Sequence, residues 1–323
     1  MSTPLKAILM LVAALVLLGA IAACSPLQTI NALTPSSTYT LTEGLAYGSD
    51  PRDRLDIYAP ADTVGSAPVV VFFYGGSWSM GSRTDYKFVG EALASRGIVA
   101  VIADYRLYPQ VRYPAFLQDS AAAVAWTAKE VQRYGGDPKR LFVMGHSAGG
   151  YNAAMVALDP RWLAGSGQTP AILRGWIGLA GPYDFIPIKD EIVRPVFFFP
   201  NTPPESQPIN HVSAAAPSTL LIASNQDRLV DPVRNTGGLA AKLRGAGVRV
   251  SEIYTDHTSH TSLVGSLARP LRGLAPTLDL VEKFVKSDGG RIGALQATTA
   301  TVATLATAAT PTISGAAPVA AAR

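Results

Sequence analysis

The chain has 323 residues and a formal charge of +4; 48% of its residues are apolar and 15% are charged. This composition excludes a chain that is disordered throughout, and the roughly 260 residues between its two compositionally distinct ends suffice for one large α/β domain. The Lys and Arg residues are scattered singly, without a basic stripe or an interleaved aromatic platform, which argues against a nucleic-acid-binding protein.

The N-terminal segment predicts export. Lys6 precedes an uncharged apolar run, Ala7–Ala23, which is short for a bilayer span of about 20 residues but suits the core of a signal peptide. The run ends at Ile21-Ala22-Ala23-Cys24, which resembles a bacterial lipobox. We therefore expect 1–23 to be a lipoprotein signal peptide and Cys24 to carry a lipid anchor in the cell envelope, facing the periplasm or the exterior. A cleaved signal that releases a soluble protein and an uncleaved anchor helix remain alternatives.

Cys24 is the only cysteine, so the chain can form no intrachain disulfide, and the thiol is best explained as the anchor. Several acyl chains on one residue hold a protein stably at a membrane. Residues 24–37 contain Pro26, Pro35 and small polar residues, and predict a tether of limited order. Residues 288–323 are rich in Ala and Thr, and predict a disordered tail.

The segment 38–287 predicts the folded domain. Leu55–Tyr58 alternates as an antiparallel edge strand should, and Pro68–Tyr74 is continuously apolar, as in a strand covered on both faces. Further elements alternate after these: helices are expected at 84–96, 115–134, 151–158 and 239–244, and strands at 98–103, 141–144, 176–179, 219–223 and 248–254. The alternation predicts a mostly parallel central sheet flanked by helices on both faces, with the functional residues at the carboxyl ends of its strands.

One long segment interrupts this rhythm. Residues 186–213 carry six prolines around Phe197-Phe198-Phe199, and we interpret them as a short cap insertion that packs over something apolar. Ordinary packing of a surface loop against the core is the alternative.

A serine lies at the corner between a predicted strand and a predicted helix. In Gly145-x-Ser147-x-Gly149 the glycines remove the Cβ atoms that would clash in a tight turn, which leaves the Ser147 hydroxyl exposed. Serine is a weak nucleophile unless a histidine base and an acid that orients this base arrive from other loops. The motif therefore predicts a nucleophile elbow that needs two partners from elsewhere in the chain.

Four histidines are candidates for the base. His146 is adjacent to the nucleophile, so its side chain should diverge from that of Ser147 and support the turn, and His211 lies in the predicted cap. His257 and His260 both follow the last predicted strand, and His260 directly precedes a helical pattern.

Three aspartates are candidates for the acid. Asp227 follows a predicted strand at the expected carboxyl end. Asp231 precedes Pro232 and is explained as a helix cap, and Asp184 precedes the predicted cap insertion, where a turn or a substrate contact is expected.

Attack on an acyl group also requires amide donors for the developing oxyanion. The amide of Ala148 directly follows the nucleophile, and Gly76 and Ser77 follow the first buried strand in a turn that is poor in side chains. These three residues are the predicted oxyanion hole.

Several motifs occur together, in consistent order between about residues 55 and 285, and resemble the carboxylesterase group of the α/β-hydrolases, namely its hormone-sensitive-lipase-like and feruloyl or acetyl-xylan-esterase-like branches. They are Tyr74-Gly75-Gly76-Ser77-Trp78, Asp104-Tyr105-Arg106-Leu107-Tyr108-Pro109, Gly135-Gly136-Asp137-Pro138, Gly145-His146-Ser147-Ala148-Gly149-Gly150 and Gly178-Leu179-Ala180-Gly181-Pro182-Tyr183-Asp184. The resemblance implies hydrolysis of a small-molecule carboxylic ester through an acyl-enzyme, without a metal or organic cofactor. It assigns Ser147 as nucleophile, His260 as base and Asp227 as the acid that orients it.

The chain departs from this family at two places. The family commonly has histidine where Tyr74 stands, and often His-Gly where Ala223-Ser224 precedes Asp227. Tyr74 should preserve the oxyanion turn but alter the fit of the substrate, whereas the second departure weakens the assignment of Asp227. The alternatives are arylformamidase or other amide hydrolysis on the same triad, and a hydrolase-fold binding module without catalysis.

Overall fold

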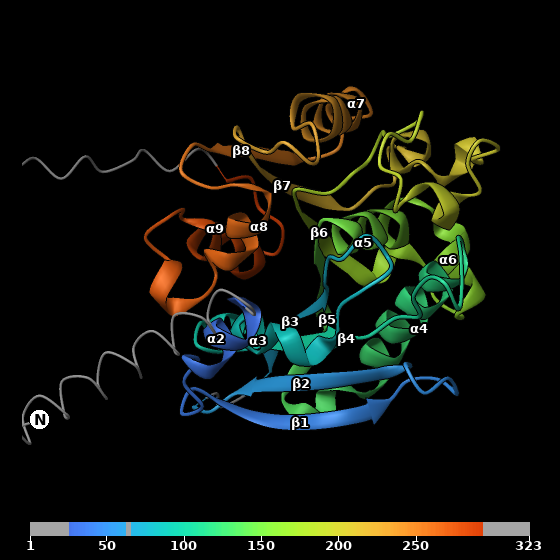
Figure 1. The fold of residues 1–323 in the computed structure, drawn as a ribbon. Helices are drawn as coiled ribbons and strands as arrows, with labels where there is room; N and C mark the ends of the chain where they lie inside the picture. Colours follow the sequence, from blue (N-terminus) through green and yellow to red (C-terminus); the bar gives the residue numbers. More distant parts are fainter. Residues whose placement is uncertain (1–25, 63–65, 293–323) are drawn as a thin grey trace, which may run out of the picture. The chain divides into compact units, whose positions relative to one another are not determined.

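A computed structural model of the chain describes residues 26–62 and 66–292 (Figure 1). The predicted signal peptide, Cys24 and most of the predicted tail lie outside the described residues. None of the helices within 26–62 and 66–292 combines the length and the apolar character needed to cross a bilayer.

A single eight-stranded sheet forms the centre of the domain, in the order β1-β2-β4-β3-β5-β6-β7-β8. Strand β2 is antiparallel to both of its neighbours, and all other adjacent pairs are parallel. The predicted mostly parallel sheet is therefore confirmed. The strands are β1 (Tyr39–Ala46), β2 (Arg54–Pro60), β3 (Ala67–Phe73), β4 (Val99–Ala103), β5 (Gly136–His146), β6 (Leu173–Leu179), β7 (Ser218–Ser224) and β8 (Val250–Thr255).

Helices cover both faces of the sheet (Figure 1). α3 and α9 pack together on one side, and α4, α5 and α6 pack together on the other. All seven residues of β3 are buried between these layers, which is why this strand is continuously apolar. The α-helices are α2 (Pro26–Ala32), α3 (Lys87–Ala94), α4 (Ala115–Glu130), α5 (Ala148–Leu158), α6 (Pro160–Gly165), α7 (Gly238–Gly245), α8 (His260–Gly265) and α9 (Thr277–Lys286).

One prediction at the N-terminal side of the domain is wrong, and one strand was not predicted. β2 is not the edge strand, because β1 lies outside it and continues the sheet. β1 was missed because its burial is irregular: the pairing shifts between Thr42 and Leu45, so the side chains do not alternate strictly.

Residues 26–32 also differ from the predicted tether, because they form helix α2. The Asn31 side chain donates to the carbonyl of Thr84 at 2.9 Å and accepts from the amide of Phe88 at 3.2 Å. Leu27 and Ile30 pack against the core. Long-range contacts thus order a seven-residue segment that is too short to be a stable helix alone.

The predicted cap insertion contains no α-helix but three short 3₁₀ helices, at Arg194–Phe197, Pro204–Ser206 and Pro208–His211. Its aromatic run is divided between the interior and the surface. Phe197 is fully buried and packs against Trp78, Phe116 and Tyr151, whereas Phe198 and Phe199 are exposed. Phe197 thus belongs to the core of the domain.

The folded part extends past residue 287. The amide of Ile292 donates to Ser251 Oγ in β8 at 2.8 Å, and the Ile292 side chain is buried. Residues 288–292 are therefore packed on the domain, which corrects the predicted start of the tail.

Candidate active site

Ser147 occupies the corner between β5 and α5 with a left-handed backbone, φ 54° and ψ −122°. A Cβ on Gly145 would lie 2.1 Å from the carbonyl oxygen of Gly149, and one on Gly149 would lie 2.0 Å from that of Phe73. Backbone atoms occupy both positions, so no side chain fits at either glycine. The strained serine is held in addition by its amide, which donates to the carbonyl of Leu179 at 2.9 Å.

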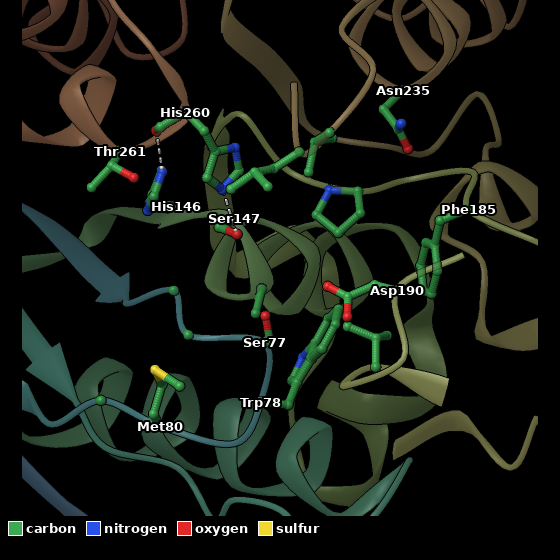
Figure 2. Close-up of a pocket in the computed structure, with 18 of the residues that line it drawn as sticks. Ser77, Trp78, Met80, His146, Ser147, Phe185, Asp190, Asn235, His260 and Thr261 are labelled. Atoms are coloured by element: carbon green, nitrogen blue, oxygen red, sulfur yellow. Dashed lines mark hydrogen bonds between the residues drawn. The ribbon is translucent and has the colours of Figure 1, made fainter. Parts of the chain in front are cut away.

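The hydroxyl of Ser147 is the first member of a chain of three side chains. His260 Nε2 lies 2.8 Å from Ser147 Oγ, and His260 Nδ1 lies 2.7 Å from Asp227 Oδ2 (Figure 2 shows the first contact). His260 is the first residue of α8, and Ser259 caps this helix by accepting from the amide of Ser262 at 3.3 Å. The structure thus brings the three predicted residues within hydrogen-bond distance from three distant loops.

The carboxylate of Asp227 is fixed on both oxygens. Its Oδ1 accepts from the amides of Leu229 and Val230, each at 2.9 Å, while Oδ2 faces His260. Burial raises the pKa of Asp227, but the hydrogen bond and the charge of His260 and the two amides outweigh burial, so the pKa is lowered overall. An ionised Asp227 accepts a hydrogen bond from His260 Nδ1–H, which keeps the proton on Nδ1 and directs the Nε2 lone pair at Ser147.

The other candidate acids have structural partners. Asp231 Oδ1 accepts from the amides of Val233 and Arg234 at 3.0 and 3.1 Å, so it binds free backbone amides as predicted. Pro232, however, is the N-cap of the helical segment Val233–Gly237 and not its first residue. Asp184 forms an ion pair with the Arg234 guanidinium at 3.0 Å.

The other histidines are also explained without proton transfer. His146 diverges from Ser147 as predicted, and its Nε2–H donates to the backbone carbonyl of His260 at 2.8 Å (Figure 2). Burial, and then the neighbouring charge of His260, lower the pKa of His146 to about 3, so it stays neutral. His211 contacts the carbonyl of Glu205 at 2.6 Å, and His257 is exposed.

The predicted oxyanion turn has an unusual backbone. Gly76, Ser77 and Trp78 all have positive φ, at 126°, 51° and 56°. The carbonyl of Gly76 points back into the turn and accepts from the amides of Ser79 and Met80 at 3.0 and 3.1 Å. Among the described residues, the amides of Gly76 and Ser77 donate to no backbone carbonyl, and both residues line the same cavity as Ser147 and Ala148. These amides are thus available to a ligand.

Tyr74 is built into a buried ionic network under this turn. Its hydroxyl donates to Asp104 Oδ1 at 2.7 Å and accepts from Arg52 Nη2 at 2.8 Å. Asp104 also binds the Arg83 guanidinium at 2.6 Å. Tyr74 therefore anchors the start of the oxyanion turn through its hydroxyl, from a fully buried position.

Ser224 shows how the second departure from the family pattern is accommodated. Its Oγ accepts from the amide of Gln226 at 3.0 Å and donates to the carbonyl of Thr258. This side chain joins the loop that carries Asp227 to the loop that carries His260, which fixes the spacing of the two residues.

Ser147 opens into a cavity of about 630 Å³ (Figure 2). Much of its wall is apolar, and several of these residues were not expected from the sequence. They are Leu27, Trp78, Met80, Phe185, Ile188 and Val193. Trp78 is held by its Nε1–H, which donates to Asn152 Oδ1 at 3.0 Å. Within 26–62 and 66–292, no three His, Cys, Asp or Glu side chains gather as a metal-binding group.

A mostly parallel sheet with helices on both faces, a strained serine after β5 and the order serine, aspartate, histidine define the α/β-hydrolase fold. Comparison with known structures agrees. The chain superimposes on a bacterial heroin esterase with a TM-score of 0.67 and 22% identity, over 82% of this chain and 90% of that one. It superimposes on an esterase of Pyrobaculum calidifontis with a TM-score of 0.66 and 22% identity, over 81% of this chain and 89% of that one. At these identities the likeness shows the fold.

Sequence comparison adds named esterases. The family model BD-FAE matches residues 55–191. The probable isoprenylcysteine alpha-carbonyl methylesterase ICMEL1 of Arabidopsis thaliana is 27% identical, over 71% of this chain and 52% of that protein. Esterase LipC of Mycobacterium tuberculosis is 30% identical, over 64% of this chain and 56% of that protein. The chain thus spans about half the length of the curated relatives it matches.

Proposed function

We propose that the chain is a serine carboxylesterase that works through an acyl-enzyme. The observation that carries the proposal is the continuous contact from Ser147 Oγ through His260 to the Asp227 carboxylate, at 2.8 and 2.7 Å. A hydroxyl, an imidazole and a buried carboxylate in this order generate a nucleophile without a metal. The esterase names of the relatives support the same reaction class.

In the proposed first half-reaction, Ser147 Oγ attacks the ester carbonyl carbon while His260 Nε2 takes the hydroxyl proton. The carbonyl oxygen becomes an oxyanion, which the amides of Ala148, Gly76 and Ser77 stabilise by hydrogen bonds. His260 then gives its proton to the leaving alcohol, and the serine remains acylated. In the second half-reaction, His260 deprotonates a water that attacks the acyl-enzyme, and the acid leaves as Ser147 regains its proton.

The test is Ser147→Ala. We expect turnover of a short-acyl nitrophenyl ester to be lost while the melting temperature stays within about 2 °C, because a side chain smaller by one oxygen fits the same corner. A fluorophosphonate probe should label the parent chain at residue 147 and leave the variant unlabelled. Equal hydrolysis by both proteins would refute the assignment of Ser147 as the nucleophile. If the probe failed to label the folded parent protein, the result would favour a binding module without catalysis.

Paired assays decide between ester and formamide hydrolysis. We expect a nitrophenyl ester to be cleaved with the higher kcat/KM, and an aryl formamide to be cleaved slowly or not at all. The reverse order would replace the proposal by the formamidase alternative.

We further propose that Cys24 is lipidated and holds the domain at a membrane of the bacterial cell envelope. The support is the sequence alone, an uncharged apolar run that ends in Ala-Ala-Cys. Metabolic labelling with an alkyne fatty acid should mark the parent chain but not Cys24→Ser. Equal labelling of both chains would exclude this residue as the anchor.

A further inference from the structure

Two exposed large apolar side chains line the cavity, and two more are exposed directly beside lining residues in the chain. Met80 (60% exposed) and Leu229 (76%) line the cavity, and Ile192 (55%) and Val233 (76%) are each the direct chain neighbour of a lining residue. We call these four residues the apolar rim. They make up half of the eight large apolar residues that are exposed in the described part of the chain. Exposed apolar side chains on segments that line a cavity point to a surface that contacts something apolar.

The N-terminal helix enters the domain at the same mouth. Leu27 on α2 lines the cavity that contains Ser147, and the Asn31 contacts with Thr84 and Phe88 hold the helix there. Cys24 lies three residues before Leu27 and directly follows the apolar sequence Ala7–Ala23. Three residues of chain span about 11 Å at most. A lipid on Cys24, as proposed above, would therefore be linked to the cavity wall by no more than this length of chain.

Charged residues also line the cavity among the apolar ones. They are Asp85, Asp184, Lys189, Asp190, Asp231 and Arg234. A mixed surface of this kind suits the zone of lipid headgroups and upper acyl chains, where apolar side chains insert by about 5–10 Å and charged groups stay hydrated.

We propose that the mouth of the cavity faces a lipid bilayer, with the apolar rim in its interfacial zone. Two independent features carry this proposal, namely the exposed apolar rim and the position of Leu27, three residues after Cys24, in the cavity wall. The substrate class follows if the proposed esterase function holds: an ester that partitions into the bilayer reaches Ser147 from the lipid side. The wall formed by Trp78, Phe185 and Ile188 suits the apolar part of such an ester.

The orientation is tested with single tryptophans added to the full chain, namely Ile192→Trp and Val233→Trp, at positions where a larger side chain has room. Gln132→Trp is the control, since Gln132 is exposed and precedes β5, whose eleven residues place it about 33 Å along the sheet from Ser147. The proteins are reconstituted in phosphatidylcholine–phosphatidylglycerol vesicles with and without bromine near the carboxyl end of the acyl chains.

We expect bromine to remove more than half of the added fluorescence at positions 192 and 233 and less than a tenth at position 132. Equal quenching at all three positions overturns the proposal. A blue-shifted but unquenched signal at 192 and 233 also overturns it, because a protein segment, either residues 7–23 or a second copy of the chain, would then cover the rim.

A kinetic comparison tests the substrate class. We expect Ile192→Gln with Val233→Gln to lower hydrolysis of a vesicle-borne long-acyl ester at least fivefold and to change hydrolysis of a water-soluble short ester less than twofold. Leu274→Gln is the matched control, because Leu274 is exposed but neither lines the cavity nor adjoins a lining residue in the chain. Equal losses in control and rim variants refute delivery from the membrane. If the parent chain hydrolyses neither ester, the esterase proposal fails, and the bromine result still decides the orientation.

Discussion

Asp227→Asn tests the proton relay most directly, because the structure decides which way the new amide must face. Asp227 Oδ1 accepts two backbone amides, from Leu229 and Val230, each at 2.9 Å. The asparagine oxygen is therefore held on these amides, and its NH₂ group takes the place of Oδ2, 2.7 Å from His260 Nδ1. Because the asparagine NH₂ group is a donor, Nδ1 of His260 must act as the acceptor, and the imidazole proton moves to Nε2. A protonated Nε2 cannot take the hydroxyl proton of Ser147.

The wrong tautomer costs about 10⁴-fold in kcat in enzymes with this triad, which corresponds to about 5 kcal/mol of transition-state stabilisation. The asparagine has the same shape and keeps both amide contacts, so we expect KM and the melting temperature to change little. The assay is steady-state hydrolysis of a short-acyl nitrophenyl ester at neutral pH, with urea unfolding in parallel.

Asp231→Asn is the comparison, because the sequence left this residue as a rival acid. Its carboxylate caps the turn at Val233 and Arg234, so we expect kcat to stay within tenfold and a loss of stability of about 1 kcal/mol at most. The reasoning is refuted if Asp227→Asn retains kcat within tenfold of the parent, or if Asp231→Asn loses as much.

Three further changes probe the scaffold of the site. The pKa of His146 is lowered to about 3 in the folded protein, below the unfolded value of 6.5, so the stability that this residue contributes is lost as the pH drops below 6.5. We expect urea titrations to show a loss of about 2 kcal/mol in the free energy of unfolding at pH 5. This loss should be absent in His146→Gln. Gly149→Ala places Cβ 2.0 Å from the carbonyl oxygen of Phe73 and should lower the free energy of unfolding by at least about 3 kcal/mol. The control Gly165→Ala places Cβ in open space and should leave stability unchanged or raise it. Equal unfolding midpoints of the two variants would contradict this. Tyr74→Phe removes one buried and one partly buried hydrogen bond, so it should cost about 1–3 kcal/mol of stability and lower kcat more than it raises KM. An unchanged kcat would show that the Tyr74 hydroxyl does not support the oxyanion turn.

Much of the fold could be predicted from local sequence. The apolar run of β3 and the glycines around Ser147 have single physical explanations, namely burial on both faces and a backbone turn that leaves no room for Cβ. The position of each residue after a strand made Ser147, Asp227 and His260 candidates, and the resemblance to the α/β-hydrolases then selected them from their rivals. These features depend on neighbours a few residues away, so periodicity and residue size determine them.

Only the tertiary structure decided those features that depend on contacts between residues far apart in the chain. The hydrogen bond between Ser147 and His260 joins residues 113 positions apart, and its geometry depends on Ser224 joining two loops that sequence alone does not place together. Helix α2 is ordered by contacts with α3, which is why a segment with the composition of a tether becomes part of the cavity wall. Local propensity and spacing thus determined which residues could react, whereas long-range packing determined which of them meet and which surface surrounds them.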